Sequence, residues 1–192
     1  MCIRDSLQDG DAFVLQTEFL MQILEGIHKY LPNIKHVTTY ARADSIARKS
    51  VSELRELKTA GIEHLYCGME TGSDLILRKI NKGFDTATII ISGTKAKEAG
   101  MVLSEFTLFG IGGKELAEEN AVETAKVLNV IKPDFVRVHA TGIKLSSEMW
   151  NYVKNKELTL QSEEEIVSEQ KIMLELLADD MDCIYMNEHI VN

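Results

Sequence analysis

A junction occurs twice in this chain of 192 residues, in which a predicted helix ends at a glycine and an apolar strand begins at once. Residues 59–62 read Thr-Ala-Gly-Ile, and residues 98–101 read Glu-Ala-Gly-Met. Glycine ends helices because it adopts the left-handed conformation at little cost. Such short returns connect a helix to the next strand in right-handed parallel winding. The junctions therefore predict an α/β fold built on a parallel sheet.

Hydrophobic periodicity predicts the elements around these junctions. Apolar residues at every third or fourth position indicate helices, and short apolar runs indicate buried strands. We expect helices over residues 17–30, 50–60, 74–81, 86–99, 115–131 and 162–179, and strands over residues 36–42, 64–70, 102–109 and 134–140. Ser50 with Glu53 and Ser162 with Glu165 have the spacing of capping boxes. With only two prolines and no low-complexity tract, the sequence favours one domain.

Composition narrows the classes of function. The chain is 45% apolar and 27% charged, which is typical of a globular protein. No window reaches the roughly 18 uninterrupted apolar residues of a membrane span, so we expect a cytoplasmic protein with no membrane partner. The net charge of −9 disfavours a nucleic-acid partner. Cys2, Cys67 and Cys183 are odd in number and far apart, so we expect free thiols.

In a parallel βα fold, ligands bind at the carboxyl ends of the strands. The polar and glycine-containing segments at these ends are residues 42–45, 70–74, 110–115 and 141–142, preceded by residues 9–11. If Glu70 points inward, period-two alternation places His64, Tyr66 and Gly68 beside it on the inner face. The same alternation places Leu65, Cys67 and Met69 against the helices, so Cys67 is expected in the core.

Several of these segments resemble radical S-adenosylmethionine (SAM) enzymes of the elongator and coproporphyrinogen-dehydrogenase type. Residues 68–74 (Gly-Met-Glu-Thr-Gly-Ser-Asp) and the later Lys-Gly at 82–83 resemble the family's Gly-x-Glu-Ser-Gly-Ser-Asp…Lys-Gly segment. Residues 9–12, 38–42 and 109–113 look like further family segments in the same order. The resemblance implies a partial (β/α)6 TIM-like barrel of parallel strands, with the first strand missing and the second truncated.

The resemblance also implies roles for individual residues. Glu70 would accept the ribose hydroxyls of SAM, Asp9 to Asp11 would receive its ammonium, and Arg42 would pair with its carboxylate or with a substrate acid. The full set of implied cofactor-binding residues is Asp9, Gly10, Asp11, Arg42, Glu70, Gly72, Ser73, Gly110, Gly112 and Gly113. Tyr40, Arg137 and His139 would face the substrate.

Each of these assignments has a structural alternative. Residues 9–11 form an ordinary turn in that case, and Glu70 pairs with a lysine. Arg137 and His139 then form a satisfied structural pair, and Ser73 caps the helix that follows it. The sequence alone leaves these alternatives open.

The cysteines that hold the family's iron–sulfur cluster, usually arranged as CxxxCxxC after the first strand, have no counterpart here. We therefore expect no metal ligands in this chain. Residues 1–6 (Met-Cys-Ile-Arg-Asp-Ser) match the translation of a common transposase-adapter end, so we expect them to be an artefact that precedes a partial core domain over residues 7–192. Residues 186–192 resemble, more weakly, a segment near the carboxyl end of one branch of the family.

For the parent protein, the resemblance implies reductive cleavage of SAM at a four-iron four-sulfur cluster. An external donor would supply the electron, and the 5′-deoxyadenosyl radical would act on a small molecule or another, unknown substrate. The isolated chain would be inactive and prone to non-native association through its open barrel edge. Two alternatives remain: a TIM-barrel lyase or isomerase with Glu70 and His139 as acid and base and residues 110–113 around a phosphate, or a non-catalytic interaction protein.

Overall fold

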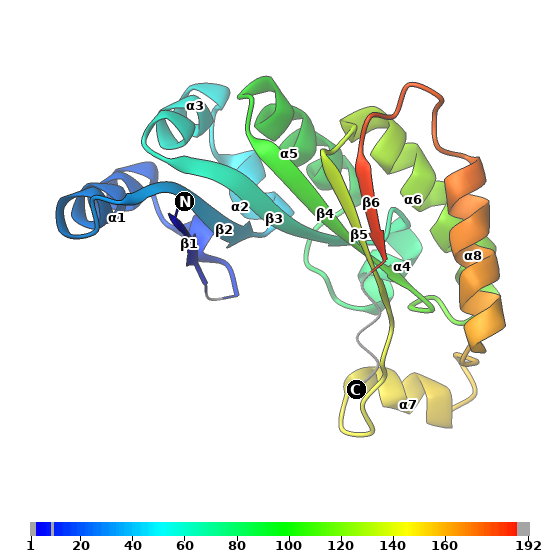
Figure 1. Ribbon diagram of the computed structural model, residues 1–192. Helices are drawn as coiled ribbons and strands as arrows, with labels where there is room; N and C mark the ends of the chain where they lie inside the picture. Colours follow the sequence, from blue (N-terminus) through cyan, green and yellow to red (C-terminus); the bar gives the residue numbers. More distant parts are fainter. Residues whose placement is uncertain (1–2, 9, 188–192) are drawn as a thin grey trace.

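The computed structural model describes residues 3–8 and 10–187. Its centre is a six-stranded sheet in which every neighbouring pair of strands is parallel. The strands are β1 (Ile3–Leu7), β2 (Ile34–Ala41), β3 (Ile62–Glu70), β4 (Val102–Phe109), β5 (Phe135–Ala140) and β6 (Ile184–Asn187). Their order in the sheet is their order in the chain, and β1 and β6 form the two edges of a twisted open sheet (Figure 1). The expected α/β fold with parallel winding is confirmed.

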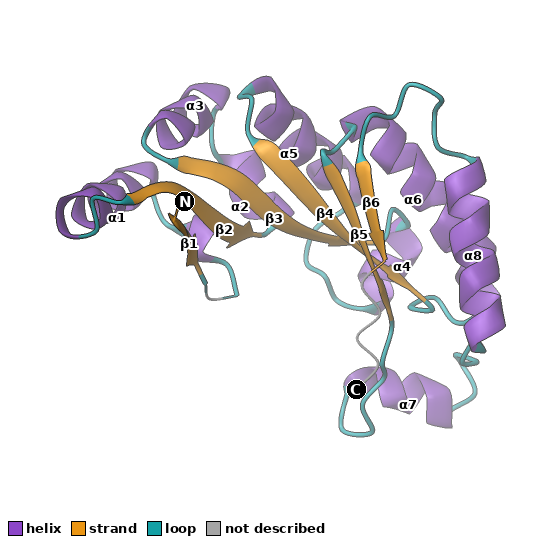
Figure 2. Cartoon of the chain, in the orientation of Figure 1, coloured by secondary structure: helices purple, strands orange, loops and turns teal. Residues whose placement is uncertain are grey.

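Helices follow most strands and gather on one side of the sheet (Figure 2). They are α1 (Thr17–Tyr30), α2 (Ala43–Arg48), α3 (Val51–Thr59), α4 (Asp74–Lys79), α5 (Thr86–Glu98), α6 (Ala117–Ile131), α7 (Glu148–Lys154) and α8 (Glu163–Glu175), with 3-10 turns η1 (Ala12–Val14) and η2 (Lys114–Leu116). The other face of the sheet is concave and is left open by these helices. A ligand site on that face is therefore built from strand residues and from the loops at the strand ends.

The core lies between the sheet and the helices. Leu65, Cys67 and Met69 of β3 are fully buried there, as the period-two alternation predicted. Their neighbours Tyr66 and Gly68 lie on the concave face. A single strand therefore separates the apolar core from the candidate site, and neighbouring residues serve opposite faces.

The glycine junctions and capping boxes form as expected. Gly61 and Gly100 have φ angles of 117° and 75°, which an L side chain rarely adopts. The hydroxyl of Ser50 accepts the backbone N–H of Glu53, and the Glu53 carboxylate accepts the backbone N–H of Ser50. The same reciprocal bonds begin α8 at Ser162. These local signals fixed most helix boundaries to within a few residues.

Residues 3–6, set aside in the sequence analysis as part of an artefact, belong to β1. The strand pairs with β2 from Ile3 opposite Ile34 to Leu7 opposite Thr39. This pairing does not bear on the origin of residues 1–6, so that origin and the 7–192 domain boundary stay predictions. Cys2, Asp9 and residues 188–192 lie outside the described residues. Most of the weaker carboxyl-terminal resemblance falls there, while residues 186 and 187 end β6.

Candidate functional site

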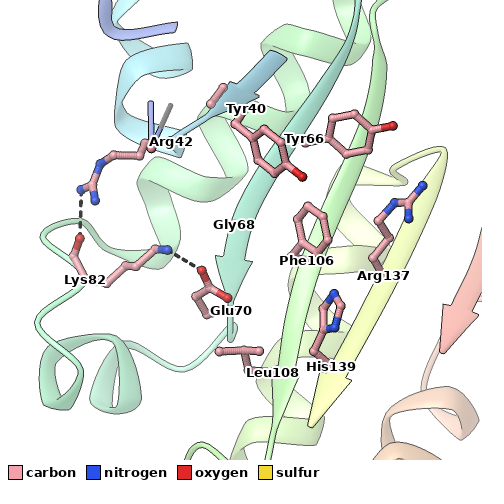
Figure 3. A pocket seen from close by; sticks show the side chains of 12 residues that line it. Tyr40, Arg42, Tyr66, Gly68, Glu70, Lys82, Phe106, Leu108, Arg137 and His139 are labelled. Atoms are coloured by element: carbon pink, nitrogen blue, oxygen red, sulfur yellow. Dashed lines mark hydrogen bonds and ion pairs between the residues drawn. The ribbon is translucent and has the colours of Figure 1, made fainter. Parts of the chain in front are cut away.

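A hollow of about 580 Å³ lies on the concave face, near the carboxyl ends of the strands. Its lining comes from β2 to β5 and from the loops beside them (Figure 3). The lining residues are Gly10, Tyr40, Ala41, Arg42, Tyr66, Gly68, Glu70, Lys82, Phe106, Leu108, Arg137 and His139. Six residues predicted from the sequence thus meet in one place: Gly10, Tyr40, Arg42, Glu70, Arg137 and His139.

Glu70 ends β3 in an unusual backbone conformation. Its φ angle is 64°, and the register between β3 and β4 shifts between Gly68 and Glu70. A left-handed non-glycine residue at a bulge costs about 1–2 kcal/mol, and such residues concentrate at functional sites. The bulge turns the carboxylate toward the hollow (Figure 3).

Lys82 pairs with this carboxylate. Its Nζ lies 2.6 Å from Glu70 Oε1, and the two side chains are 17% and 21% exposed. The structural alternative, that Glu70 pairs with a lysine, is therefore realised here. It is compatible with a ligand role, because both partners also line the hollow.

Gly68 provides the room for this ion pair. A Cβ atom on Gly68 would lie 2.6 Å from Glu70 Oε1 and 3.3 Å from Lys82 Nζ. The ion pair therefore rests against the bare backbone of β3. This contact explains why a glycine precedes the glutamate by two residues on the same face of the strand.

Arg42 is held by groups of the protein. Its Nη2 donates to the Lys82 carbonyl oxygen at 2.9 Å, and its Nε donates to Asp44 Oδ1 at 3.0 Å. The guanidinium carbon lies 5.1 Å from the centre of the Phe84 ring, a cation–π contact. Arg42 therefore anchors the segment that carries Lys82.

Asp11 ties the corner after β1 to the start of α2. Its Oδ1 accepts the backbone N–H of Arg42 at 3.1 Å, and its Oδ2 accepts the hydroxyl of Ser45 at 2.5 Å. The carboxylate thus satisfies donors at a helix N-terminus. Both oxygens of the Asp11 carboxylate therefore have protein partners. The neighbouring Gly10 lines the hollow.

Gly72 and Ser73 face α6 and do not line the hollow. A Cβ on Gly72 would lie 2.2 Å from the carbonyl oxygen of Glu123, and the Gly72 N–H donates to Thr124 Oγ1 at 2.9 Å. The Ser73 hydroxyl caps α4 by accepting the Ile76 N–H, as expected, and donates to α6. The glycine that the sequence suggested for close approach to a ligand instead allows close approach of a helix.

The glycine corner after β4 is likewise filled by protein. The Gly110 N–H donates to Glu169 Oε2 at 3.0 Å, and the Gly113 N–H donates to the Gly110 carbonyl at 3.2 Å. A Cβ on Gly112 would lie 2.9 Å from Ile76 Cδ1. Gly110, Gly112 and Gly113 therefore pack against neighbouring segments, and two of the amides that would grip a phosphate are already bonded.

Aromatic rings cover the floor of the hollow. Tyr40 lies 5.4 Å from Tyr66, Tyr66 lies 6.2 Å from Phe106, and Phe106 lies 5.5 Å from His139, all between ring centres. The guanidinium of Arg137 lies 5.3 Å from the centre of the Tyr66 ring. The residues predicted to face a substrate do line the hollow. Sequence analysis missed Phe106, although its alternation with Ser104 and Leu108 in β4 could have placed it there.

The hollow is positively charged in a negatively charged chain. Its lining holds three basic side chains, Arg42, Lys82 and Arg137, and one carboxylate, Glu70. The whole chain carries a formal charge of −9. The local excess of cations favours a ligand with at least one anionic group.

A second carboxylate lies behind the sheet. Glu105 of β4 is fully buried, and among the described residues neither of its oxygens has an N–H or O–H partner. Burial raises the pKa of Glu105 to about 8, and it raises the pKa of the neighbouring Cys67 thiol well above its usual value. Both groups face the core, so neither reaches the hollow. Within residues 3–8 and 10–187, no three His, Cys, Asp or Glu side chains form a group that could hold a metal ion.

Comparison with known proteins shows which folds this architecture resembles. No family profile matches the sequence. The heme chaperone HemW of Bacillus subtilis is 24% identical over 167 residues, which cover 86% of this chain and 43% of HemW. Coproporphyrinogen III oxidase (HemN) from Escherichia coli, a radical SAM enzyme, superposes with a TM-score of 0.64 at 14% identity, covering 90% of this chain and 38% of HemN. The fold is that of a radical SAM enzyme.

Two further solved structures superpose on nearly the whole of this chain. Elp3 of Methanocaldococcus infernus superposes with a TM-score of 0.70 at 14% identity, covering 98% of this chain and 47% of that protein. A domain of pyruvate-formate lyase-activating enzyme from Bacteroides vulgatus gives 0.60 at 15% identity and covers 94% and 96% of the two chains. The chain spans less than half the length of HemW, HemN and Elp3.

Among the helices of residues 3–8 and 10–187, none combines the length and the apolar character of a membrane span.

Proposed function

We propose that this chain is part of a radical SAM enzyme and supplies the pocket for the adenosyl portion of SAM. The observation that carries the proposal is the position of Glu70. Its carboxylate stands at the carboxyl end of β3, inside a partly apolar hollow, above a bare glycine. A carboxylate in such a place can accept both hydroxyls of a ribose, and the aromatic floor can cover the flat base.

The geometry narrows the set of residues that we propose to contact the ligand. Gly68, Glu70 and the rings of Tyr40 and Tyr66 line the hollow directly. Arg42 supports the pocket through Lys82. The residues that pack against other parts of the protein act by shaping the corners: Gly72 and Ser73 against α6, Gly110 against α8, and Gly112 and Gly113 against α4, η2 and residues 158–159.

The described residues do not fit a four-iron cluster. The Cys67 thiol is buried in the core, and Cys183 is a single half-buried thiol before β6. We infer that the cluster ligands of the parent protein lie outside this part of the chain. The parent would then cleave SAM reductively with an external electron donor and act on a small molecule or another substrate, while the isolated chain would be inactive. Arg137 and His139, on the far side of the aromatic floor, are proposed to face that substrate.

The competing acid–base enzyme draws on the same hollow, since Glu70 and His139 both line it. It also requires a phosphate grip at residues 110–113, where the Gly110 and Gly113 amides already have protein acceptors. The non-catalytic alternative draws on the exposed edges of the sheet, such as Ile184 of β6 at 57% exposure. The adenosyl pocket uses more of the described geometry than either.

Calorimetric titration with adenosine tests the proposal on the 192-residue chain. Adenosine should bind about tenfold more tightly than 2′,3′-dideoxyadenosine, because only adenosine offers hydroxyls to Glu70. Glu70→Gln should remove most of that preference, and the exposed Glu25→Gln on α1 should keep it. Equal affinity of the two nucleosides for the unchanged chain would contradict the proposal.

A further inference from the structure

The Glu70 carboxylate, the proposed acceptor for the ribose, is already engaged. Lys82 Nζ donates to its Oε1 at 2.6 Å, and a carboxylate needs both oxygens to chelate two vicinal hydroxyls. We propose that Lys82 is a specificity-determining residue that competes with the ribose diol for Glu70. This inference rests on the function proposed above and concerns how tightly that site holds its ligand.

The ion pair is strong enough to matter. Both side chains are about four-fifths buried, at 17% and 21% exposure. A hydrogen bond between two charged groups is roughly twice as strong as a neutral one, and partial burial limits its screening by water. Separating Lys82 from Glu70 therefore subtracts from the free energy of ligand binding.

A ligand that reaches the Glu70 carboxylate also contacts the Lys82 ammonium, because the two groups are adjacent. Both charged groups lie against the bare backbone of Gly68, which itself lines the hollow. Figure 3 shows the lysine reaching from the α4–α5 loop to the end of β3, where the Glu70 side chain begins. A diol at Glu70 must therefore share or replace the position of the ammonium.

The backbone that carries Lys82 is fixed, so the exchange is confined to the side chain. The Lys82 carbonyl accepts Arg42 Nη2 at 2.9 Å, and the Lys82 N–H donates to the Leu77 carbonyl at 3.0 Å. Gly83 follows with a φ angle of 88°, and a Cβ there would lie 3.3 Å from Arg42 Nη2. Arg42 is thus a positioning residue, which sets where the lysine stem begins.

The Phe84 ring lies beside the ammonium of Lys82. Lys82 Nζ lies 5.5 Å from the centre of the Phe84 ring, within reach of a cation–π contact. Rotation about the flexible stem of the lysine can move the charge from the carboxylate toward the ring face without moving the loop. In the structure the ammonium makes the Glu70 and Phe84 contacts at once. We infer that the stem lets it leave Glu70 while staying near the ring, and that the diol selects that arrangement.

Two measurable consequences follow. Lys82→Met keeps an unbranched stem as far as Cε and removes the competing charge, so adenosine should bind about fivefold more tightly. Adenosine is uncharged, so salt should change its affinity mainly through ion pairs of the protein. About a fifth of each side chain is exposed, so raising the ionic strength weakens the pair, though less than it weakens a surface pair. Adenosine should therefore bind the unchanged chain somewhat more tightly in high salt and the Lys82→Met chain equally at both.

The experiment is calorimetric titration of the full chain with adenosine and with 2′,3′-dideoxyadenosine at low and high salt. It compares the unchanged chain, Lys82→Met, and the exposed control Lys171→Met on α8. We expect tighter adenosine binding in Lys82→Met alone, no change for the dideoxy nucleoside, and a salt response that Lys82→Met lacks.

The outcomes separate the two claims. If the unchanged chain prefers adenosine but Lys82→Met binds it equally or more weakly, the competition is refuted and the adenosyl pocket stands. If neither chain prefers adenosine, the proposed function fails and the competition fails with it. If Lys82→Met does not fold, the salt response of the unchanged chain decides, and weaker or unchanged binding in high salt overturns the proposal.

Discussion

The backbone N–H of Gly72 donates a hydrogen bond to the hydroxyl of Thr124 at 2.9 Å and so joins the loop after β3 to the middle of α6. The approach leaves no space for a side chain, because a Cβ on Gly72 would lie 2.2 Å from the Glu123 carbonyl oxygen. The contact therefore supports the candidate site from the helix-covered side of the sheet. It keeps the loop that follows Glu70 in place while the concave face stays open.

Gly72→Ala should therefore destabilise the fold. The added methyl group meets helix backbone, which cannot move aside, so we expect a loss of about 2–4 kcal/mol in the free energy of unfolding. Denaturant unfolding followed by circular dichroism measures it. Gly26→Ala is the matched control, because a Cβ there has nothing within 4 Å and alanine favours the interior of α1. Equal stability of the two variants would show that α6 does not pack against Gly72.

The buried carboxyl of Glu105 should make stability depend on pH. Its pKa is raised from 4.5 to about 8 in the folded chain, so the folded state binds a proton that the unfolded state has already released. The contribution of Glu105 to the free energy of unfolding should therefore be fully present below pH 4.5 and fall as the pH rises toward 8, by at most about 1.4 kcal/mol per pH unit. Unfolding curves between pH 5 and pH 9, about the range that these pKa values bracket, measure the slope.

Glu105→Gln provides the test of that assignment. The amide cannot ionise, so the variant should lose most of the slope and be more stable than the unchanged chain at about pH 9. Glu25→Gln on the exposed face of α1 should keep the slope. A slope that survives in Glu105→Gln would assign the pH dependence to other groups.

Glu169 should stabilise the glycine-containing loop at residues 110–113. Its carboxylate is 1% exposed and accepts three donors: the Gly110 N–H, Asn120 Nδ2 and Gln161 Nε2. Glu169→Gln replaces one acceptor oxygen with an NH₂ group that faces donors, so we expect a loss of about 1–3 kcal/mol in the free energy of unfolding. Faster hydrogen exchange at the Gly110 amide should accompany it. Unchanged exchange at Gly110 would argue that the corner is held by packing alone.

Gly68→Ala should disturb the ion pair without breaking the fold. The new Cβ would lie 2.6 Å from Glu70 Oε1 and 3.3 Å from Lys82 Nζ, which are the ends of flexible side chains. Both side chains must shift, so the preference for adenosine over its dideoxy analogue should fall severalfold in calorimetric titrations. Far-ultraviolet circular dichroism should stay unchanged. An unaltered preference would place the diol away from Gly68.

Local signals predicted the framework of this protein well. The capping boxes of α3 and α8 and the glycines at 61 and 100 depend on neighbouring residues, so the sequence shows them directly. Period-two alternation also placed Tyr66 and Gly68 on the concave face. The short elements α2, α7 and β6 were missed, because segments of four to seven residues carry too little periodicity to recognise.

Some of the predicted site residues line the hollow and others pack against protein, and the difference has one physical cause. Gly72 was predicted at the ligand because glycine allows a close approach, and Gly110 because the family resemblance implied it, but the sequence does not say which group approaches a glycine. Here the approaching groups are Glu123 of α6 and Ile166 of α8, more than 50 residues away in the chain. Lys82 was noted as part of a motif, but its pairing with Glu70 depends on the Arg42 contact that fixes its loop.

The central claim is that the concave face, at Glu70, receives an adenosyl group. Nuclear magnetic resonance titration of the isotope-labelled 192-residue chain with S-adenosylhomocysteine tests this claim directly, because each backbone amide reports its own surroundings. We expect the largest shifts at residues 66–70 and at Lys82, and a loss of those shifts in Glu70→Gln. Largest shifts at residues 110–113, or shifts that persist undiminished in Glu70→Gln, would contradict it.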